Sequence, residues 1–212
     1  MSPLAGVPVV TCTLLADGSS DQVLLPILQW LLDNHCNSIT RLRVANPLQT
    51  ASRGLQERIS AALDLYPCHV LFVHRDAERD EPANRQQEVE RAWHSIEREQ
   101  HLVTIVPVRM TEAWLPVDAA AIRTAAGNPN GRVRLDMPDL DRLEQLPDPK
   151  ALLFDLLARA TELGPQRLRK FSPEARRHRI AEVTAGFDRL RALPSFAHLE
   201  TQFQQLFLAE QC

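Results

Sequence analysis

Four short apolar runs rich in β-branched residues, each followed by a helical pattern, constrain the fold of this chain most strongly. The helical patterns lie at residues 20–32, 52–66, 85–99 and 110–126, and the apolar runs lie at residues 7–15 (VPVVTCTLL), 38–45 (SITRLRVA), 69–74 (HVLFVH) and 102–108 (LVTIVPV). Strands that alternate with helices join in parallel, because each helix carries the chain back across a sheet face. We therefore predict an α/β fold with a mainly parallel four-stranded sheet flanked by helices.

The pattern changes after the turn sequence GNPNG at residues 127–131, and no further strand is indicated. Three more helices are predicted, at residues 148–163, 172–193 and 195–210. Two of them begin with a polar residue and a proline, the arrangement typical of a helix N-terminus. We predict an α/β domain over residues 1–130 and a C-terminal helical extension over residues 131–212 that packs on it. Pro26 is expected to kink or shorten the first helix.

Charge and cysteine content restrict the classes of protein to consider. The net charge of −3 gives the chain no overall attraction to nucleic acid, so such binding needs a local basic surface. The four cysteines form no CxxC pair, which favours reduced thiols over a disulfide framework or a zinc site. We find no leader pattern and no apolar run long enough to span a bilayer. These features predict a cytoplasmic protein with no membrane partner.

Several familiar catalytic motifs are absent from the sequence. We find no Walker A, G-x-G-x-x-G, G-x-S-x-G or H-E-x-x-H pattern. ATP hydrolysis, nicotinamide chemistry, serine hydrolysis and zinc peptidase chemistry are therefore disfavoured.

Carboxylates follow three of the four predicted strands. Their residues are Asp17 and Asp21 after the first strand, Asp76, Glu78 and Asp80 after the third, and Glu112 after the fourth. The carboxyl ends of parallel strands share one sheet edge, where open α/β sheets bind ligands. Carboxylate oxygens suit Mg²⁺ or Mn²⁺, so the pattern predicts a divalent metal site at this edge.

Each acidic cluster also has a purely structural interpretation, which the sequence leaves open. Ser19 or Ser20 can cap the first helix, and Asp21 in its first turn suits the helix dipole. Residues 75–85 (RDAERDEPANR) can be a solvated loop, and Glu112 can be an ordinary first-turn acid.

Three stretches of the sequence, in this order, resemble the Toprim (topoisomerase-primase) family. LLADGSSDQVLLPIL at residues 14–28 is similar to its opening motif, in which a strand ends in an acid followed by glycine. LFVHRDAERD at residues 71–80 is similar to its second motif, a strand ending in D-x-D or a variant. VPVRMTEAWLPVD at residues 106–118, with LPDPKALL at residues 146–153, resembles small stand-alone relatives of the OLD-type nucleases. The resemblance implies a Rossmann-like Toprim fold.

The resemblance further implies a Mg²⁺-dependent (or Mn²⁺-dependent) nuclease that cleaves nucleic-acid phosphodiesters, with DNA favoured over RNA. It makes Asp17, Asp76 and Glu78 catalytic metal ligands, with Glu112 as a further catalytic acid and Asp80 as an additional metal ligand. Asp17 replaces the usual glutamate, and Glu78 replaces the usual second aspartate. By analogy, the chain would act in bacterial phage defence with a partner ATPase, and it could also assemble with copies of itself.

Cations near the acidic clusters are candidates for holding phosphate. The predicted nucleic-acid contacts are Arg75, Arg79 and Arg109 beside the acids, and Arg169, Lys170, Arg176 and Arg177 in the basic segment at residues 165–179. Ion pairing with neighbouring acids, or a solvated helix face, explains the same residues. His74 can be a general base, a metal ligand or a structural residue.

Three functional hypotheses follow. The first is the Toprim-like nuclease. The second is a non-catalytic Toprim-like interaction subunit of a larger complex, in which the two altered acids have weakened the metal site. The third is phosphoryl hydrolysis of a small molecule by the same acids.

Overall fold

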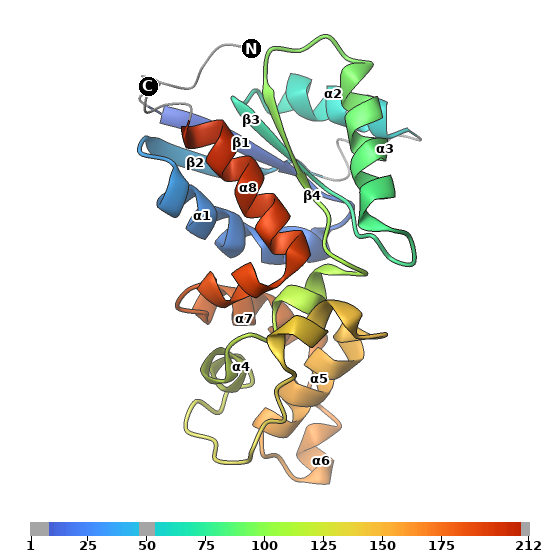
Figure 1. Ribbon diagram of the computed structural model, residues 1–212. Helices are drawn as coiled ribbons and strands as arrows, with labels where there is room; N and C mark the ends of the chain where they lie inside the picture. Colours follow the sequence, from blue (N-terminus) through green and yellow to red (C-terminus); the bar gives the residue numbers. More distant parts are fainter. Residues whose placement is uncertain (1–8, 47–53, 209–212) are drawn as a thin grey trace.

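The computed structural model describes residues 9–46 and 54–208 and has an α/β architecture (Figure 1). Four strands form one sheet in the order β2-β1-β3-β4, and every neighbouring pair is parallel. The strands are β1 (Val9–Leu15), β2 (Ile39–Val44), β3 (Val70–His74) and β4 (His101–Ile105). The predicted fold class is therefore confirmed. Residues 7 and 8 of the first predicted strand lie outside the described residues.

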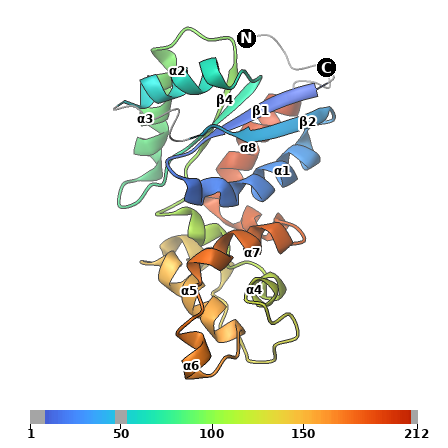
Figure 2. The ribbon, with the colours of Figure 1, turned by 180° about the vertical axis from the view of Figure 1, so that it is seen from behind.

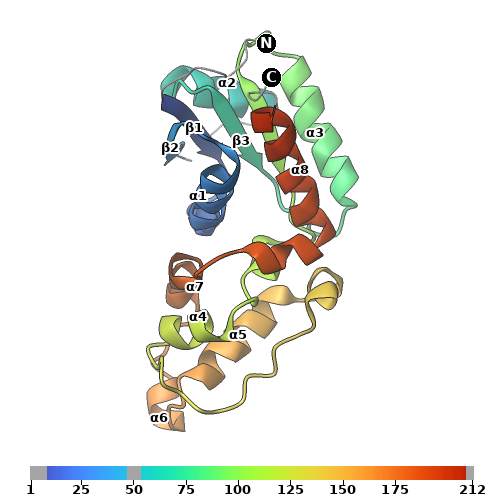
Figure 3. The same ribbon diagram turned by 60° about the vertical axis from the view of Figure 1, so that its left-hand side comes forward.

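Helices cover both faces of the sheet, as Figures 2 and 3 show. On one face lie α1 (Leu24–His35) and α8 (Pro194–Leu208), and on the other lie α2 (Leu55–Leu65) and α3 (Pro82–His94). Phe72 of β3 stacks on Phe203 of α8 with ring centroids 5.3 Å apart, so the helix closest to the C-terminus completes the core of the sheet. All five residues of β3 are buried, as expected for a central strand covered on both faces.

The remaining helices form a second layer beyond the carboxyl ends of the strands (Figure 1). They are α4 (Ala119–Ala125), α5 (Pro149–Ala160), α6 (Pro165–Leu168) and α7 (Arg177–Val183), with short 3₁₀ turns between them. One buried apolar cluster runs from Val10 in the sheet through Leu153 of α5 to Phe207 of α8. The helical layer therefore shares its core with the sheet. None of the helices within the described ranges is long and apolar enough to cross a membrane.

Two of the predicted helices that contain a proline begin as a 3₁₀ turn and continue as an α-helix. The first predicted helix forms the 3₁₀ turn Ser19–Val23 followed by α1 from Leu24 to His35, so the α-helix starts later than predicted, two residues before Pro26, as expected where proline shortens a helix. Pro26 lies in the first turn of α1, where the missing N–H costs no helical hydrogen bond. Residues 110–126 form the 3₁₀ turn Thr111–Trp114 and then α4. Pro116 has no N–H to continue the hydrogen bonds of the turn, and Asp118, whose backbone is extended, caps α4 by accepting from the Ala120 N–H at 2.8 Å.

The single helix predicted over residues 172–193 is wrong. This stretch forms a 3₁₀ turn (Glu174–Arg176), then α7, and then a second 3₁₀ turn (Asp188–Ala192). The helix α7 ends at Val183, and the next residue, Thr184, two residues before Gly186, has an extended backbone. Glycine is unfavourable inside a helix by about 1 kcal/mol relative to alanine, so the apolar spacing alone did not decide the outcome.

Candidate functional site

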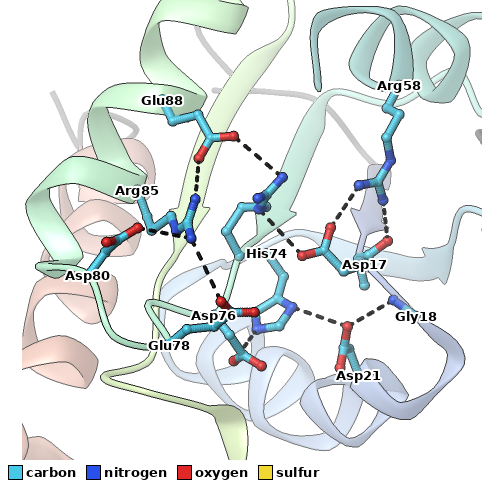
Figure 4. Close-up of polar contacts among 12 residues, drawn as sticks. Asp17, Gly18, Asp21, Arg58, His74, Asp76, Glu78, Asp80, Arg85 and Glu88 are labelled. Carbon is cyan, nitrogen blue, oxygen red and sulfur yellow. Dashed lines mark hydrogen bonds and ion pairs between the residues drawn. The ribbon is translucent and has the colours of Figure 1, made fainter. Parts of the chain in front are cut away.

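The strand order places a topological switch point between β1 and β3. After β1 the chain adds β2 along one edge of β1. It then crosses to the other edge of β1, where β3 and β4 are added in turn. Open α/β sheets bind ligands in the crevice outside the carboxyl ends of the strands at such a point. Asp17 follows β1 and Asp76 follows β3, so both predicted metal ligands flank the switch point (Figure 4).

Two arginines from different elements hold the Asp17 carboxylate. Arg58 of α2 donates from Nη1 to Asp17 Oδ1 at 2.7 Å and from Nη2 to the carbonyl oxygen of Ala16, also at 2.7 Å. Arg75 Nε lies 3.4 Å from Asp17 Oδ2. The Asp17 side chain is 43% exposed, so it remains accessible from solvent although both of its oxygens have cationic partners.

His74 occupies the centre of the site, with its side chain only 1% exposed. Its Nδ1 lies 3.4 Å from Asp21 Oδ2, an ion-pair contact without hydrogen-bond alignment. Its Nε2 lies 3.2 Å from Asp76 Oδ1 and 3.1 Å from Thr111 Oγ1. Burial alone would lower the pKa of His74, but the two carboxylates outweigh it and raise the pKa to about 9. His74 is therefore an imidazolium at neutral pH.

Asp21 combines a capping role with this charge network. Its Oδ2 accepts a hydrogen bond from the Gly18 N–H at 3.0 Å, and its Oδ1 accepts one from Ser20 Oγ at 3.0 Å. Burial tends to raise the pKa of Asp21, but His74 and these two donors lower it below its usual value. Gly18 rather than Ser20 stands at the N-cap position of the 3₁₀ turn, and Asp21 reaches back to it. The structural interpretation of Asp21 therefore holds alongside its contact with His74.

Asp76 is fixed through one carboxylate oxygen. Asp76 Oδ1 accepts from the N–H of Thr111 at 3.0 Å and from its hydroxyl at 3.3 Å, and it also faces His74. Each hydrogen bond and ion pair that the Asp76 carboxylate makes with the described residues uses Oδ1. The side chain is 31% exposed, so Asp76 is an oriented carboxylate at the rim of the sheet.

The two remaining acids of the β3 loop share one cation. Arg85 Nη2 of α3 lies 3.0 Å from Asp80 Oδ2 and 3.9 Å from Glu78 Oε2, while its Nη1 lies 3.0 Å from Glu88 Oε2. Arg75 Nη1 approaches the other oxygen of Glu88 at 3.5 Å. Figure 4 shows the side chains of Glu78, Asp80, Arg85 and Glu88 gathered on one side of His74.

The backbone is strained where this loop meets the loop after β4. Glu78 has φ of 54° and Arg109 has φ of 62°, both in the left-handed region, which costs a residue other than glycine roughly 1–3 kcal/mol. The Glu78 N–H donates to the carbonyl oxygen of Arg109 at 2.8 Å, so a backbone hydrogen bond joins the two strained residues.

A cleft of about 560 Å³ opens beside these two residues. It lies between the loops after β3 and β4 and the start of α5. Its charged lining consists of the acids Glu78, Asp80 and Asp148 and the cations Arg79, Arg109 and Lys150. Lys150 pairs with Glu174 at 3.2 Å and Asp148 caps α5, whereas no ion pair of Arg79 or Arg109 is found among the described residues. Two guanidinium groups thus line the cleft without a carboxylate partner in the described part of the chain.

Glu112 and Arg177 do not line this cleft. They form an ion pair with each other, with both side chains 7% exposed, and Arg177 Nη2 also lies 3.1 Å from Glu174 Oε1. Glu112 was predicted to act at the rim and Arg177 to contact nucleic acid, and both roles require accessible side chains. The structure places them inside, where each charge is the other's partner.

The other predicted cations divide into two groups. Arg75 is held by Asp17 and Glu88, as described above. Arg169, Lys170 and Arg176 are exposed on the helical layer.

A divalent metal would have to share these carboxylates with the arginines. Within residues 9–46 and 54–208, no group of three or more His, Cys, Asp or Glu side chains is arranged to hold an ion. Mg²⁺ commonly uses one or two carboxylates together with substrate phosphates. Glu78 and Asp80, which approach the same Arg85 nitrogen, supply such a pair of oxygen donors beside Asp76. The described residues form no closed protein cage, so a metal ion here would have to displace Arg85 from these oxygens and would need substrate phosphate to complete its ligands.

Sequence reasoning missed Arg58, Arg85 and Glu88 as members of the site. Arg85 and Glu88 are three residues apart on one helix, a spacing that indicates a salt bridge. Arg58 carries no comparable signal, because it lies 41 residues from Asp17 in the sequence.

Comparisons with known proteins identify no relative. No family model, no curated protein and no solved structure matches this chain.

Proposed function

We propose that this protein is a divalent-metal-dependent phosphodiesterase that cleaves nucleic acid at the cleft beside β3 and β4. The observation that carries the proposal is the lining of the cleft, which contains both the acids Glu78 and Asp80 and the cations Arg79 and Arg109. Phosphodiester cleavage needs carboxylates to hold a metal ion and cations to hold the phosphate. The resemblance to Toprim proteins implies the same chemistry for Asp76 and Glu78.

Each side chain has a defined part in this proposal. Asp76, Glu78 and Asp80 would hold Mg²⁺ or Mn²⁺, which lowers the pKa of bound water and neutralises developing charge on phosphate oxygens. Arg79 and Arg109 bind the phosphate that enters the cleft, since guanidinium groups form bidentate contacts with phosphate. His74 and Thr111 orient the Asp76 carboxylate by occupying its Oδ1.

Cleavage of plasmid DNA and of RNA by the purified protein, with Mg²⁺, with Mn²⁺ and with EDTA, tests the proposal. We expect metal-dependent cleavage that the Asp76→Asn variant loses by at least about a hundredfold, since the amide cannot replace a metal-binding carboxylate. Asp33→Asn, which alters a carboxylate on α1 hydrogen-bonded to Gln29, is the matched control and should retain full activity. Equal traces with metal and with EDTA would contradict the proposal.

The ion pairs of Asp17 favour a second candidate, a non-catalytic module that binds nucleic acid or a partner subunit. Asp17 stands where Toprim proteins usually carry glutamate, and Arg58 and Arg75 neutralise it. Metal affinity separates the two candidates. Isothermal titration of the protein with Mn²⁺, alone and with a non-cleavable phosphorothioate oligonucleotide, should show tighter metal binding in the presence of the oligonucleotide if the first candidate holds. A module without metal chemistry would bind the oligonucleotide equally with and without Mn²⁺.

A further inference from the structure

The basic segment, residues 165–179, lies in the helical layer and presents cations with few acidic partners. Glu174 is the only acid in the segment, and both of its oxygens are occupied, by Lys150 at 3.2 Å and by Arg177 at 3.1 Å. Arg179 pairs with Glu182. The exposed residues for which the described part of the chain offers no ion pair are Arg167, Arg169, Lys170 and Arg176.

The basic segment is joined to the cleft through α5. Lys150 lies in the first turn of α5 and lines the cleft. The twelve residues of α5 extend about 18 Å, and α6 lies at the end of the helical layer farthest from the sheet (Figure 1). The chain then returns, so that Glu174 contacts Lys150. The exposed cations therefore extend from the far end of α6 back to the mouth of the cleft.

We infer that the basic segment is a binding track for the phosphate backbone of the nucleic acid whose scissile phosphate enters the cleft. The inference rests on the proposed function and names the part of the substrate that lies outside the cleft. A length of about 18 Å corresponds to roughly five steps of one duplex DNA strand at 3.4 Å per step. The track therefore engages several phosphates on one side of the cleavage point.

The track contacts the phosphate backbone of the nucleic acid and not its bases. Phe171, the only phenylalanine, tyrosine or tryptophan in the basic segment, packs against the apolar core. None of these three side-chain types in the segment is thus available for the base stacking that single-strand binders use. The exposed side chains are instead those that contact phosphates without sequence information. We expect binding with little dependence on nucleotide sequence.

Fluorescence anisotropy with labelled oligonucleotides in EDTA tests the track separately from cleavage. Affinity should fall steeply as salt increases from about 50 to 200 mM, because phosphate contacts release counterions. Arg169→Gln/Lys170→Gln removes two of the proposed contacts. The slope of log K against log salt should become shallower by about 1.8 on duplex DNA, or by about 1.4 on a single strand.

A double variant elsewhere on the surface provides the matched control. Arg41 of β2 and Arg91 of α3 are exposed and lie outside both the cleft and the basic segment. Arg41→Gln/Arg91→Gln removes the same charge and should leave the slope unchanged. Equal slopes for the two double variants, absence of oligonucleotide binding by the unmodified chain, or equally strong competition by polyglutamate would each overturn the track. A tenfold preference between two unrelated sequences would overturn its backbone-only character.

Failure of the track and failure of the proposed function give different results. If Arg169→Gln/Lys170→Gln still cleaves in the presence of metal and its salt slope equals that of the unmodified chain, the proposed nuclease stands and the proposed track is wrong. If the unmodified chain binds the oligonucleotide in a salt-dependent way and the double variant binds it more weakly, but neither cleaves it in Mg²⁺ or Mn²⁺, the track stands and the proposed nuclease is wrong.

Discussion

The buried imidazolium of His74 makes the stability of this protein depend on pH. Its pKa is about 9 in the folded chain and about 6.5 in an unfolded chain. Below pH 6.5 His74 is protonated in both states, and its contacts with Asp21 and Asp76 contribute fully to stability. As the pH rises from about 6.5 to about 9, only the folded state holds the proton, so this contribution is progressively lost.

Replacing His74 with asparagine should therefore change both the magnitude of stability and its pH dependence. Asp21, which is 8% exposed, would lose its buried cationic partner. Breaking a buried charge pair in this way costs about 3–5 kcal/mol. Urea unfolding at pH 6, 7, 8 and 9 should give a large loss at pH 6 and a smaller one at pH 9. His94→Asn, at an exposed histidine of α3, is the control, and a His74 variant whose stability falls with pH as steeply as that of the unmodified chain would contradict this assignment.

At the scale of the residue, the sequence placed Asp17 and Asp76 at the sheet edge, but it did not predict the burial of Glu112 or which charges these acids meet. Asp17 and Asp76 follow apolar runs, and strand ends are readable from such runs. Their cationic partners depend on tertiary structure. Glu112 and Arg177 are separated by 65 residues, and nothing in the local pattern of either pairs them.

At the scale of the element, a side chain pairs with the backbone of Thr104 at the outer edge of β4. Gln202 of α8 accepts from the Thr104 N–H at 2.8 Å and donates to the Thr104 carbonyl oxygen at 2.9 Å. The amide thus makes the pair of hydrogen bonds that another strand would make. Edge strands with unpaired backbone groups are templates for association between chains, so this contact protects the β4 edge.

Gln202→Ala should weaken the protein in two measurable ways. The two backbone hydrogen bonds contribute about 0.5–1.5 kcal/mol each, so unfolding free energy should fall by about 1–3 kcal/mol. The opened edge should also promote association, visible as a concentration-dependent mass in light scattering. Gln205→Ala changes an exposed glutamine of the same helix and serves as the control. Equal stability and equal mass for the two variants would show that Gln202 does not protect the edge.

Element types were more predictable than element boundaries. The four strands were predicted within one to three residues of their positions over the described part of the chain, because buried parallel strands are continuous apolar runs. The long helix predicted over residues 172–193 failed because apolar spacing continues through a stretch, around Gly186, that is not helical.

At the scale of the whole molecule, one buried ion pair joins the sheet to the helical layer. Glu112 lies in the turn after β4, and Arg177 begins α7. The cleft spans the same two layers, since its lining includes Arg109 on one side and Lys150 on the other. The ion pair and the cleft therefore both lie where the segment after β4 meets the helical layer. The placement of the helical layer over the sheet edge depends on such long-range contacts, and so it was not predictable from local pattern.

A double-mutant cycle on this pair should reveal strong coupling. Glu112→Ala leaves Arg177 buried without its main partner and should cost about 3–5 kcal/mol, as should Arg177→Ala. Glu112→Ala/Arg177→Ala removes both charges and should cost much less than the sum of the two single changes, and this difference is the coupling energy. The exposed pair Arg179–Glu182 provides the comparison, with an expected coupling of about 0–1 kcal/mol. Similar coupling energies for the two pairs would contradict the role assigned to Glu112 and Arg177.

The position of α8 has a consequence for synthesis on the ribosome. β4 ends at Ile105, whereas the helix that covers Phe72 and closes the β4 edge begins at Pro194. At translation rates of roughly 5–20 residues per second, about 5–20 s pass between the synthesis of β4 and the synthesis of α8. During that interval the nascent chain displays an apolar face and an open strand edge. Chaperone dependence of the yield of folded protein should therefore be strongest while residues 106–193 are being added.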